Sequence, residues 1–345
     1  MAIPTDMQAL LLTNDGYAPK PTGSVLETMD SYVVLARIAV PSPRPTQLLI
    51  KVALAAINPS DVMFLKGQYG QPRVKGRPAG FEGVGTVVAT GDDPLAKFFG
   101  GRRVAFATGL SGWGSWAEYA VADAAATIPL MDTVRDEDGA AMIVNPLTAL
   151  AMFGIVRDEG EKAFVMTAGA SQLSKLILEL AKEEGFRPIV TVRRDDQISA
   201  LKEAGAAHVL NQDAPDFRSA LRRVVKAEQP RVFLDAVTGA LASAIFLAMP
   251  RRARWIVYGR LDSGATVIPE PGHLIFMHKR IEGFWLTEWM RQSKELREQA
   301  VREAQMRFSD GRWSTDVTAI VPISDAMTRV PAELAKPNGK VFIRP

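Results

Sequence analysis

Residues 163–184, which read AFVMTAGASQLSKLILELAKEE, decide the fold. Their first four residues form a continuous apolar run, which is typical of a strand that is buried on both faces. Residues 172–184 have the pattern of an amphipathic helix. The turn between them therefore lies at the carboxyl end of a strand and at the start of a helix, where free backbone N–H groups favour a pyrophosphate.

The turn carries only part of a dinucleotide-binding glycine pattern. Gly169 is its one glycine, and Ser171 and Ser174 stand where later glycines are expected. Small side chains still permit close approach of a phosphate, so we expect Ser171, Gln172 and Leu173 to contact a cofactor. An ordinary strand–helix turn without a ligand is the alternative for this segment alone.

The next apolar run, residues 188–192, is followed by Arg193 and Arg194 and then by Asp195 and Asp196. A carboxylate at this place accepts hydrogen bonds from the ribose hydroxyls of NAD, whereas guanidinium groups match the 2′-phosphate of NADPH. The two arginines therefore favour NADPH over NADH. A solvated arginine pair balanced by the two aspartates is the alternative.

The rest of the chain extends these patterns. In its middle part, apolar runs alternate with helical segments. This alternation predicts an α/β fold with a doubly wound parallel sheet, with strands at residues 163–166, 188–192, 208–210, 232–235 and 255–258. The first third has short runs cut by Gly and Pro, which predicts a β-rich domain with strands at residues 48–54, 83–89 and 103–107. A long polar helix is expected over residues 287–308, and the tail beyond it resembles the first domain.

Composition fits an ordinary globular protein with two domains. The chain has 345 residues, and its net charge of +3 is too small to indicate a nucleic-acid or membrane-surface partner. It has no cysteine, which excludes disulfides, thiolate nucleophiles and cysteine-ligated zinc. No apolar run approaches the length that spans a bilayer, and the start lacks a signal-peptide pattern. We expect a cytoplasmic protein that acts on a small molecule.

Several segments, taken in order, carry a family resemblance: INPSD (57–61), KGQYG (66–70), GFEGVG (80–85), NPLTA (145–149), VRRDD (192–196), GAAHVLN (205–211) and GFWLTEW (283–289). Together they resemble the medium-chain dehydrogenase/reductase superfamily, and most closely its zinc-independent quinone oxidoreductase and enoyl thioester reductase branches. The resemblance implies a GroES-like β-rich domain in residues 1–136, a Rossmann dinucleotide-binding domain in residues 137–286, and a return to the first domain in residues 287–345. It also implies a homodimer paired through the Rossmann sheet.

The resemblance implies roles for single residues as well. Tyr69 matches the tyrosine that donates a proton to, or stabilises the oxyanion in, the enoyl reductases. Asn58 and Thr148 match positions that line the nicotinamide, and Trp285 would wall the acceptor pocket. The alternatives are packing for Tyr69, backbone capping for Asn58 and Thr148, and a core aromatic for Trp285.

Two strand ends complete the expected cofactor site. Tyr258, Gly259 and Arg260 follow a strand and should face the cofactor, while Gln212 should pack beside the adenosine.

Departures from the zinc-dependent relatives are equally informative. Those relatives have a cysteine where this chain has Asn58 and a histidine where it has Phe81, and their third ligand falls near Val144. Ligand spacing is also missing among the histidines, which are His208, His273 and His278. We therefore expect no metal site.

A metal-free site favours a conjugated acceptor. Hydride added to the β-carbon of a quinone, an enone or a 2-enoyl thioester leaves a delocalised charge that hydrogen-bond donors can stabilise. Hydride transfer from NADPH to one of these three acceptor classes is the predicted activity. Alcohol dehydrogenation is disfavoured because the zinc ligands are absent. A nucleotide-binding protein with little catalysis, like the crystallins of this family, is the rival from another class, and the incomplete glycine pattern supports it.

Overall fold

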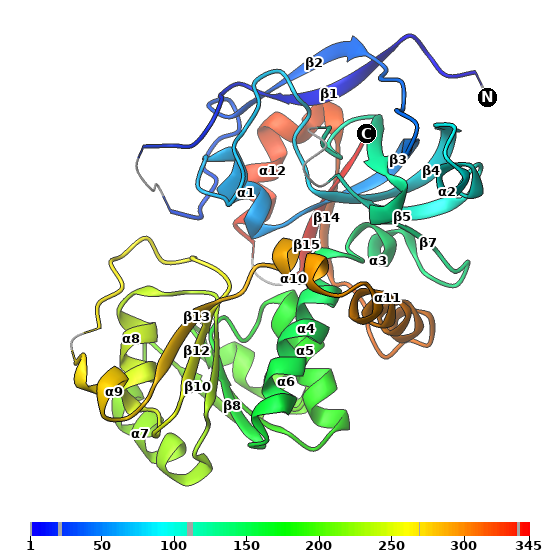
Figure 1. The fold of residues 1–345 in the computed structure, drawn as a ribbon. Coiled ribbons are helices and arrows are strands. Elements are labelled where there is room, and N and C mark those ends of the chain that lie inside the picture. The colour runs from blue at the N-terminus through cyan, green and yellow to red at the C-terminus, as the bar shows by residue number, and fades with distance from the viewer. Residues whose placement is uncertain (1, 20–22, 109–112, 269, 337–338) are drawn as a thin grey trace. The chain divides into compact units, whose positions relative to one another are not determined.

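Apolar strands from the middle of the chain form one parallel sheet in the order β10-β9-β8-β11-β12-β13. These strands are β8 (Ala163–Met166), β9 (Arg187–Val192), β10 (His208–Asn211), β11 (Val232–Asp235), β12 (Arg254–Val257) and β13 (Arg280–Gly283). Every residue of β8 and β11 is buried, as expected for strands that helices cover on both sides. Figure 1 shows helices on both faces of this sheet. The doubly wound parallel sheet predicted from the sequence is confirmed.

Helices lie before, between and after these strands, and the last of them continues past Ala300, where the unit that contains this sheet ends. They are α4 (Val144–Glu159), α5 (Gln172–Glu183), α6 (Ile198–Glu203), α7 (Phe217–Glu228), α8 (Gly239–Ala248), α9 (Gly272–Ile275), α10 (Leu286–Gln292) and α11 (Lys294–Ser309). The core on one face of the sheet contains an aromatic group in which Trp255 lies 5.8 Å from Phe233 and 5.3 Å from Phe246, measured between ring centroids.

The computed structural model describes residues 2–19, 23–108, 113–268, 270–336 and 339–345. The chain divides into two units by its internal contacts. A β-rich unit consists of Met1–Val144 and Val301–Pro345, and a parallel-sheet unit consists of Asn145–Ala300. The sequence had suggested divisions after residues 136 and 286.

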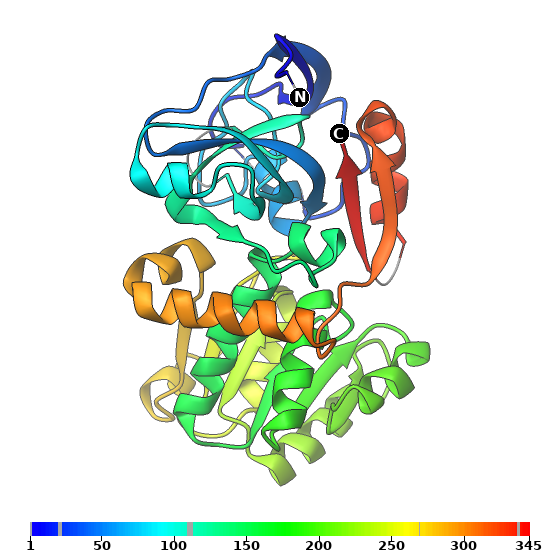
Figure 2. The ribbon, with the colours of Figure 1, turned by 90° about the vertical axis from the view of Figure 1, so that its right-hand side faces the viewer.

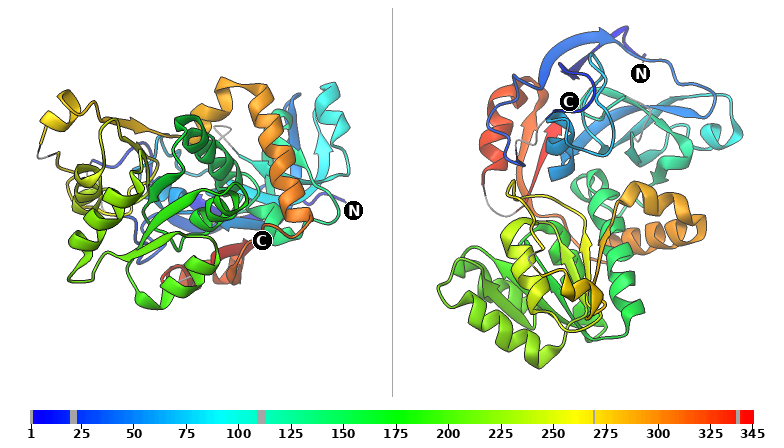
Figure 3. Two further views of the ribbon diagram at one scale, coloured as in Figure 1. Left: turned by 90° about the horizontal axis from the view of Figure 1, so that it is seen from below. Right: turned by 60° about the vertical axis from the view of Figure 1, so that its left-hand side comes forward.

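The β-rich unit contains a mixed sheet in the order β14-β15-β3-β4-β5-β7, with β6 paired to β3. Its strands are β3 (Gln47–Ile57), β4 (Glu82–Thr90), β5 (Arg103–Ala107), β6 (Tyr119–Asp123), β7 (Thr127–Pro129), β14 (Val317–Pro322) and β15 (Lys340–Arg344). Two further strands, β1 (Asp6–Leu12) and β2 (Val33–Ala39), pair antiparallel as a separate curved ribbon (Figure 3). Strands β14 and β15, which come from the C-terminal segment, belong to this mixed sheet.

Short helices complete this unit: α1 (Pro59–Leu65), α2 (Pro94–Phe98), α3 (Asp136–Ala140) and α12 (Ala326–Leu334). Figure 2 shows α12 beside the strands β14 and β15. Because β15 pairs antiparallel with β3, with Val341 opposite Ile57, it brings Lys340 next to the residue that follows β3, Asn58.

The prediction of one helix over residues 287–308 is wrong in one respect. This stretch forms two helices, α10 and α11, which are separated at Ser293. Ser293 has extended backbone angles, φ −146° and ψ 123°. Its hydroxyl accepts a hydrogen bond from the N–H of Leu296 at 3.2 Å, which is how a serine begins a new helix. In the described part of the chain, helices long and apolar enough to cross a membrane are absent.

Candidate functional site

Two serines close the turn before α5 where the sequence pattern lacks glycines. Ser171 precedes the helix, and its hydroxyl accepts from the N–H of Ser174 at 3.2 Å. The Ser174 hydroxyl donates to the carbonyl of Ala168 at 3.0 Å, and Ala168 has a left-handed φ of 53°. Gln172 and Leu173 begin α5 immediately after this turn. Side-chain hydrogen bonds therefore hold the tight turn in place of the lost glycines.

The one glycine of the turn is needed for packing. A Cβ on Gly169 would lie 2.8 Å from the Cβ of Val190 in β9, and the Gly169 N–H donates to the carbonyl of Thr191 at 2.9 Å. The turn thus lies directly against the neighbouring strand. This is the close helix–strand approach for which dinucleotide-binding turns keep a glycine.

The two arginines after β9, Arg193 and Arg194, differ in their ion pairing. Arg194 forms an exposed ion pair with Asp196, while Asp195 accepts from the side-chain amide of Asn211 at 2.8 Å. Arg193 is exposed, and no carboxylate in the described part of the chain pairs with it. Gln212 lies beside this strand end, because its N–H donates to the Val192 carbonyl at 2.8 Å. A free guanidinium therefore stands at the carboxyl end of β9.

A buried carboxylate that sequence reasoning missed organises the centre of the same sheet edge. Asp235, fully buried at the end of β11, accepts from the Thr167 hydroxyl at 2.6 Å and from the Trp255 indole N–H at 2.9 Å. It also accepts from the N–H groups of Val237 and Thr238. The signal was present in the sequence, because an aspartate ends the apolar run of residues 232–235. Asp235 ties the ends of β8, β11 and β12 together.

The residues after β12 lie beside this carboxylate. Burial raises the pKa of the half-buried Tyr258 phenol and the Asp235 charge raises it further, while a hydrogen bond with Ser174 opposes the shift. The phenol is thus protonated at neutral pH. A Cβ on Gly259 would lie 2.9 Å from the carbonyl of Ala236, so this turn also approaches a neighbour closely. Arg260 is exposed.

In the β-rich unit, four buried polar side chains form a cluster that we call the Lys340 cluster: Asn58, Asp61, Glu82 and Lys340. The Lys340 ammonium donates to the side-chain oxygen of Asn58 and lies 4.0 Å from Glu82 Oε1. The Asn58 side-chain amide donates to Glu82 Oε1 at 2.8 Å, and the Asn58 backbone N–H donates to Asp61 Oδ2 at 2.8 Å. Asn58, expected to line the nicotinamide, thus has hydrogen-bond partners for both polar ends of its side chain.

Glu82 also holds the backbone that leads into α4. Its Oε2 accepts from the N–H of Ile143 at 3.1 Å and from the N–H of Val144 at 2.9 Å. A carboxylate at the first N–H groups of a helix satisfies donors that have no partner within the helix and interacts favourably with its dipole. Thr148, another expected cofactor residue, is buried one turn further along α4.

The charges of the Lys340 cluster shift one another. Burial raises the pKa of Asp61 to about 7, and the Glu82 charge adds to this, while the hydrogen bond from Asn58 and the charge of Lys340 oppose it. Burial lowers the pKa of Lys340, and both carboxylates oppose that shift. Asp61 Oδ1 is buried without a hydrogen-bond partner, which fits a carboxyl group that carries a proton near neutral pH.

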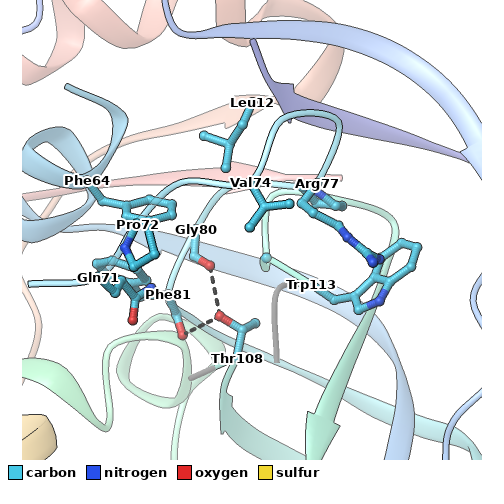
Figure 4. A pocket seen from close by; sticks show the side chains of 12 residues that line it. Leu12, Phe64, Gln71, Pro72, Val74, Arg77, Gly80, Phe81, Thr108 and Trp113 are labelled. Carbon is cyan, nitrogen blue, oxygen red and sulfur yellow. Dashed lines mark hydrogen bonds between the residues drawn. The ribbon is translucent and has the colours of Figure 1, made fainter. Parts of the chain in front are cut away.

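Tyr69, the expected proton donor, is half-buried and packs on Phe81, with ring centroids 5.0 Å apart. Phe81 in turn contacts Phe64 at 5.1 Å. Phe81 also lines a pocket of about 290 Å³ within the β-rich unit (Figure 4). Tyr69 therefore lies against the wall of an aromatic pocket. Trp285, expected to wall the acceptor site, is half-buried before α10 in the other unit.

Comparison with known proteins identifies the family. Residues 44–132 match the alcohol dehydrogenase GroES-like domain, and residues 173–305 match the zinc-binding dehydrogenase family. The solved structure of a Mesorhizobium loti protein, proposed to be an NADPH:quinone reductase, is 75% identical to this chain, with a TM-score of 0.98 and full coverage of both chains. The chain belongs to the medium-chain dehydrogenase/reductase superfamily. The resemblance stated from the sequence motifs is thereby confirmed.

More distant members of the superfamily are thioester reductases. The human mitochondrial enoyl-acyl-carrier-protein reductase is 25% identical over 314 residues, which cover 88% of this chain and 82% of that protein. The mitochondrial 2-enoyl thioester reductase heterodimer of Candida tropicalis shares the fold, with a TM-score of 0.80, 20% identity and coverage of 99% and 100%.

The residues of this chain do not fit the zinc site of the zinc-dependent members. The sequence resemblance implies that Asn58 and Phe81 replace two of its ligands, and the Lys340 ammonium donates to the amide oxygen of Asn58, where it would repel a bound cation. Among the described residues there is no group of three or more His, Cys, Asp or Glu side chains that could hold a metal ion. His208 has a different partner, because its Nε2 lies 2.7 Å from Glu228.

Proposed function

We propose that this chain is a zinc-independent reductase that transfers hydride from NADPH to a conjugated carbonyl acceptor: a quinone, an enone or a 2-enoyl thioester. The Lys340 cluster carries this proposal. By the family resemblance Asn58 stands at a metal-ligand position, and here an ammonium, an amide and a carboxylate contact one another around it. Such a site has no Lewis acid with which to polarise an isolated ketone, so the acceptor itself must delocalise the negative charge.

The choice of cofactor rests on the strand ends of the parallel sheet. The 2′-phosphate of NADPH would meet Arg193, whose guanidinium pairs with no carboxylate of the described residues, with Arg194 and Gln212 beside it. The pyrophosphate would lie at Ser171, Gln172 and Leu173, where the serine hydrogen bonds form the turn. The name of the 75% identical relative supports the same cofactor.

When bound, NADPH supplies the hydride. In the proposed reaction Tyr69 donates a hydrogen bond or a proton to the acceptor as its charge develops. Asn58 and Thr148 line the nicotinamide, and Tyr258, Gly259 and Arg260 form the wall of the cofactor site. Trp285 bounds the acceptor.

An assay of NADPH oxidation with 1,4-naphthoquinone, a simple enone and crotonyl-CoA tests the activity. We expect turnover with at least one acceptor. Tight NADPH binding without turnover on any of them would favour the rival interpretation, a nucleotide-binding protein with little catalysis. The serine hydrogen bonds weaken that rival, because the turn keeps its shape without the missing glycines.

The cofactor assignment has its own variant test. Arg193→Ala should raise the KM for NADPH at least tenfold and leave the KM for NADH unchanged, because only NADPH carries the 2′-phosphate. Arg223→Ala, an exposed arginine on α7 of the same unit, is the matched control. Equal KM changes for both cofactors would contradict the role of Arg193.

The proposal includes a homodimer and a cytoplasmic location. Strand β13 is the last strand on one side of the parallel sheet. Its Ile281 is 38% exposed, and Phe276, four residues before the strand begins, is 74% exposed. An exposed strand edge with apolar side chains is the surface through which a second sheet pairs. Light scattering after size exclusion should give the mass of two chains, and Ile281→Lys should shift it toward one.

A further inference from the structure

An arginine that has no acidic partner among the described residues lies at one end of the aromatic pocket in the β-rich unit. Figure 4 shows Arg77 and Trp113 at one end of this pocket and Phe64, Gln71 and Pro72 at the other. The pocket volume of about 290 Å³ is close to the lower end of the range for small-molecule sites, about 300 Å³. It therefore suits a compact acceptor with one or two rings.

The pocket adjoins the proposed proton donor. Phe81 lines the pocket and packs on the Tyr69 ring at 5.0 Å, and Gln71, two residues beyond Tyr69, also lines it. The floor is closed by Thr108, whose hydroxyl lies 3.0 Å from the carbonyl of Gly80. The middle of the pocket is thus apolar and aromatic, with its polar backbone groups already engaged.

Arg77 is held in place without an ion pair. The backbone N–H of Arg77 donates to the Val74 carbonyl at 3.2 Å, and the backbone carbonyl of Arg77 accepts from the Leu12 N–H at 2.8 Å. The guanidinium carbon lies 4.8 Å from the centroid of the Trp113 ring. This cation–π contact orients the guanidinium plane and leaves its N–H groups available.

Three other arginines of the same unit have protein partners. Arg103 pairs with Asp136 at 2.6 Å and Arg135 with Asp138 at 2.7 Å, and Arg73 donates to the carbonyl of Leu65 at 3.0 Å. Across the described residues, Arg77 has no such carboxylate. A half-buried cation without a counter-ion, at one end of an apolar pocket, is suited to bind an anion that arrives with the ligand.

We propose that Arg77 and Trp113 form a subsite that selects acceptors carrying an anionic group, a carboxylate or a sulfonate, on a planar conjugated body. The conjugated body occupies the aromatic part of the pocket, and the anion meets the Arg77 guanidinium. This inference rests on the proposed reductase function and names the substrate class of the same site.

A matched pair of acceptors tests the subsite. 4-Carboxybenzylideneacetone and its methyl ester share one enone and one ring and differ in charge. We expect the wild-type protein to reduce the acid with a kcat/KM at least tenfold higher than that of the ester, mainly through KM. Arg77→Met should abolish this preference while leaving the KM values for the ester and for NADPH within twofold. Arg77→Lys should retain part of it.

The control is Arg37→Met, which removes an exposed arginine of β2 in the same unit and should leave the preference unchanged. Equal kcat/KM for acid and ester in the wild type, or a preference that survives in Arg77→Met, overturns the subsite.

Calorimetric binding of the saturated acid, 4-carboxybenzylacetone, separates the subsite from the reaction. If the protein reduces none of the acceptors, the proposed function fails. Tighter binding of the saturated acid to wild type than to Arg77→Met would then still support the subsite, and equal binding would refute it.

Discussion

Replacing Lys340 by methionine should destabilise the β-rich unit, because it removes the only cation of a buried cluster. Lys340 is 5% exposed, and Glu82 and Asp61 are each 1% exposed. At the 4.0 Å between the ammonium and Glu82, and with an effective dielectric constant of about 20, the attraction is about 4 kcal/mol. Methionine keeps most of the side-chain volume, so the loss is chiefly electrostatic.

The net cost is smaller than this attraction for two reasons. Burying the ammonium is itself unfavourable, and Glu82 keeps its hydrogen bonds from Asn58 and from the two backbone N–H groups at the start of α4. Breaking a buried ion pair by removing one partner costs about 3–5 kcal/mol. We therefore expect Lys340→Met to lower the free energy of unfolding by about 3 kcal/mol at pH 8.

Urea unfolding followed by tryptophan fluorescence measures this cost, since the fully buried Trp116 lies in the same unit. Lys336→Met is the control: its side chain is 56% exposed and its ammonium pairs with Glu333 at 2.6 Å, so the loss should stay below about 1 kcal/mol. The Lys340→Met deficit should also shrink between pH 8 and pH 5.5, because protonation of Asp61 removes one of the two carboxylate charges. A deficit equal to that of the control, or one that does not change with pH, would refute the electrostatic reasoning.

Three further changes test other parts of the site. Burial raises the pKa of Asp61 from 3.8 to about 7, so ionisation of Asp61 lowers the stability of the fold as pH rises through that interval, by at most about 4 kcal/mol. The thermal stability of Asp61→Asn should therefore match that of the wild type near pH 4 and exceed it at pH 8. Asp235→Ala should cost about 3 kcal/mol in urea unfolding, because it leaves the Trp255 N–H and the Thr167 hydroxyl without their acceptor; a loss below about 1 kcal/mol would contradict this. Gly169→Ala should cost about 1–3 kcal/mol by forcing the turn away from β9 and should also raise the KM for NADPH, whereas unchanged stability would show that the turn yields easily.

The parallel sheet could be predicted from sequence because its signal is local. Each buried strand is a short apolar run, and the run of residues 163–166 proved to be β8 without change. The split at Ser293 could not be read from helical periodicity, because the residues on both sides have helical patterns and one serine hydroxyl decides the break. The serine-closed turn was also hidden, since a glycine pattern cannot show that hydroxyl groups replace it.

The Lys340 cluster lay beyond sequence reasoning for a different reason. Asn58 and Lys340 are separated by 282 positions, and only the pairing of β15 with β3 brings them together. A lysine at the start of a strand normally points to solvent. Nothing in its neighbourhood signalled that it would meet a carboxylate in the core.

The same cluster explains why specificity should depend on the far end of the acceptor pocket. Lys340 is engaged by Asn58 and faces Glu82, so its charge is balanced inside the protein and unavailable to a substrate carbonyl. In the proposed reaction the developing anion is therefore stabilised by neutral donors such as Tyr69, and the remaining charge stays on the acceptor. Conjugated acceptors of many shapes satisfy that demand about equally. In the proposed reaction, discrimination among them falls to groups that touch the acceptor away from the reacting carbon. Among the described residues that line the pocket beside Tyr69, Arg77 is the cation that can do so.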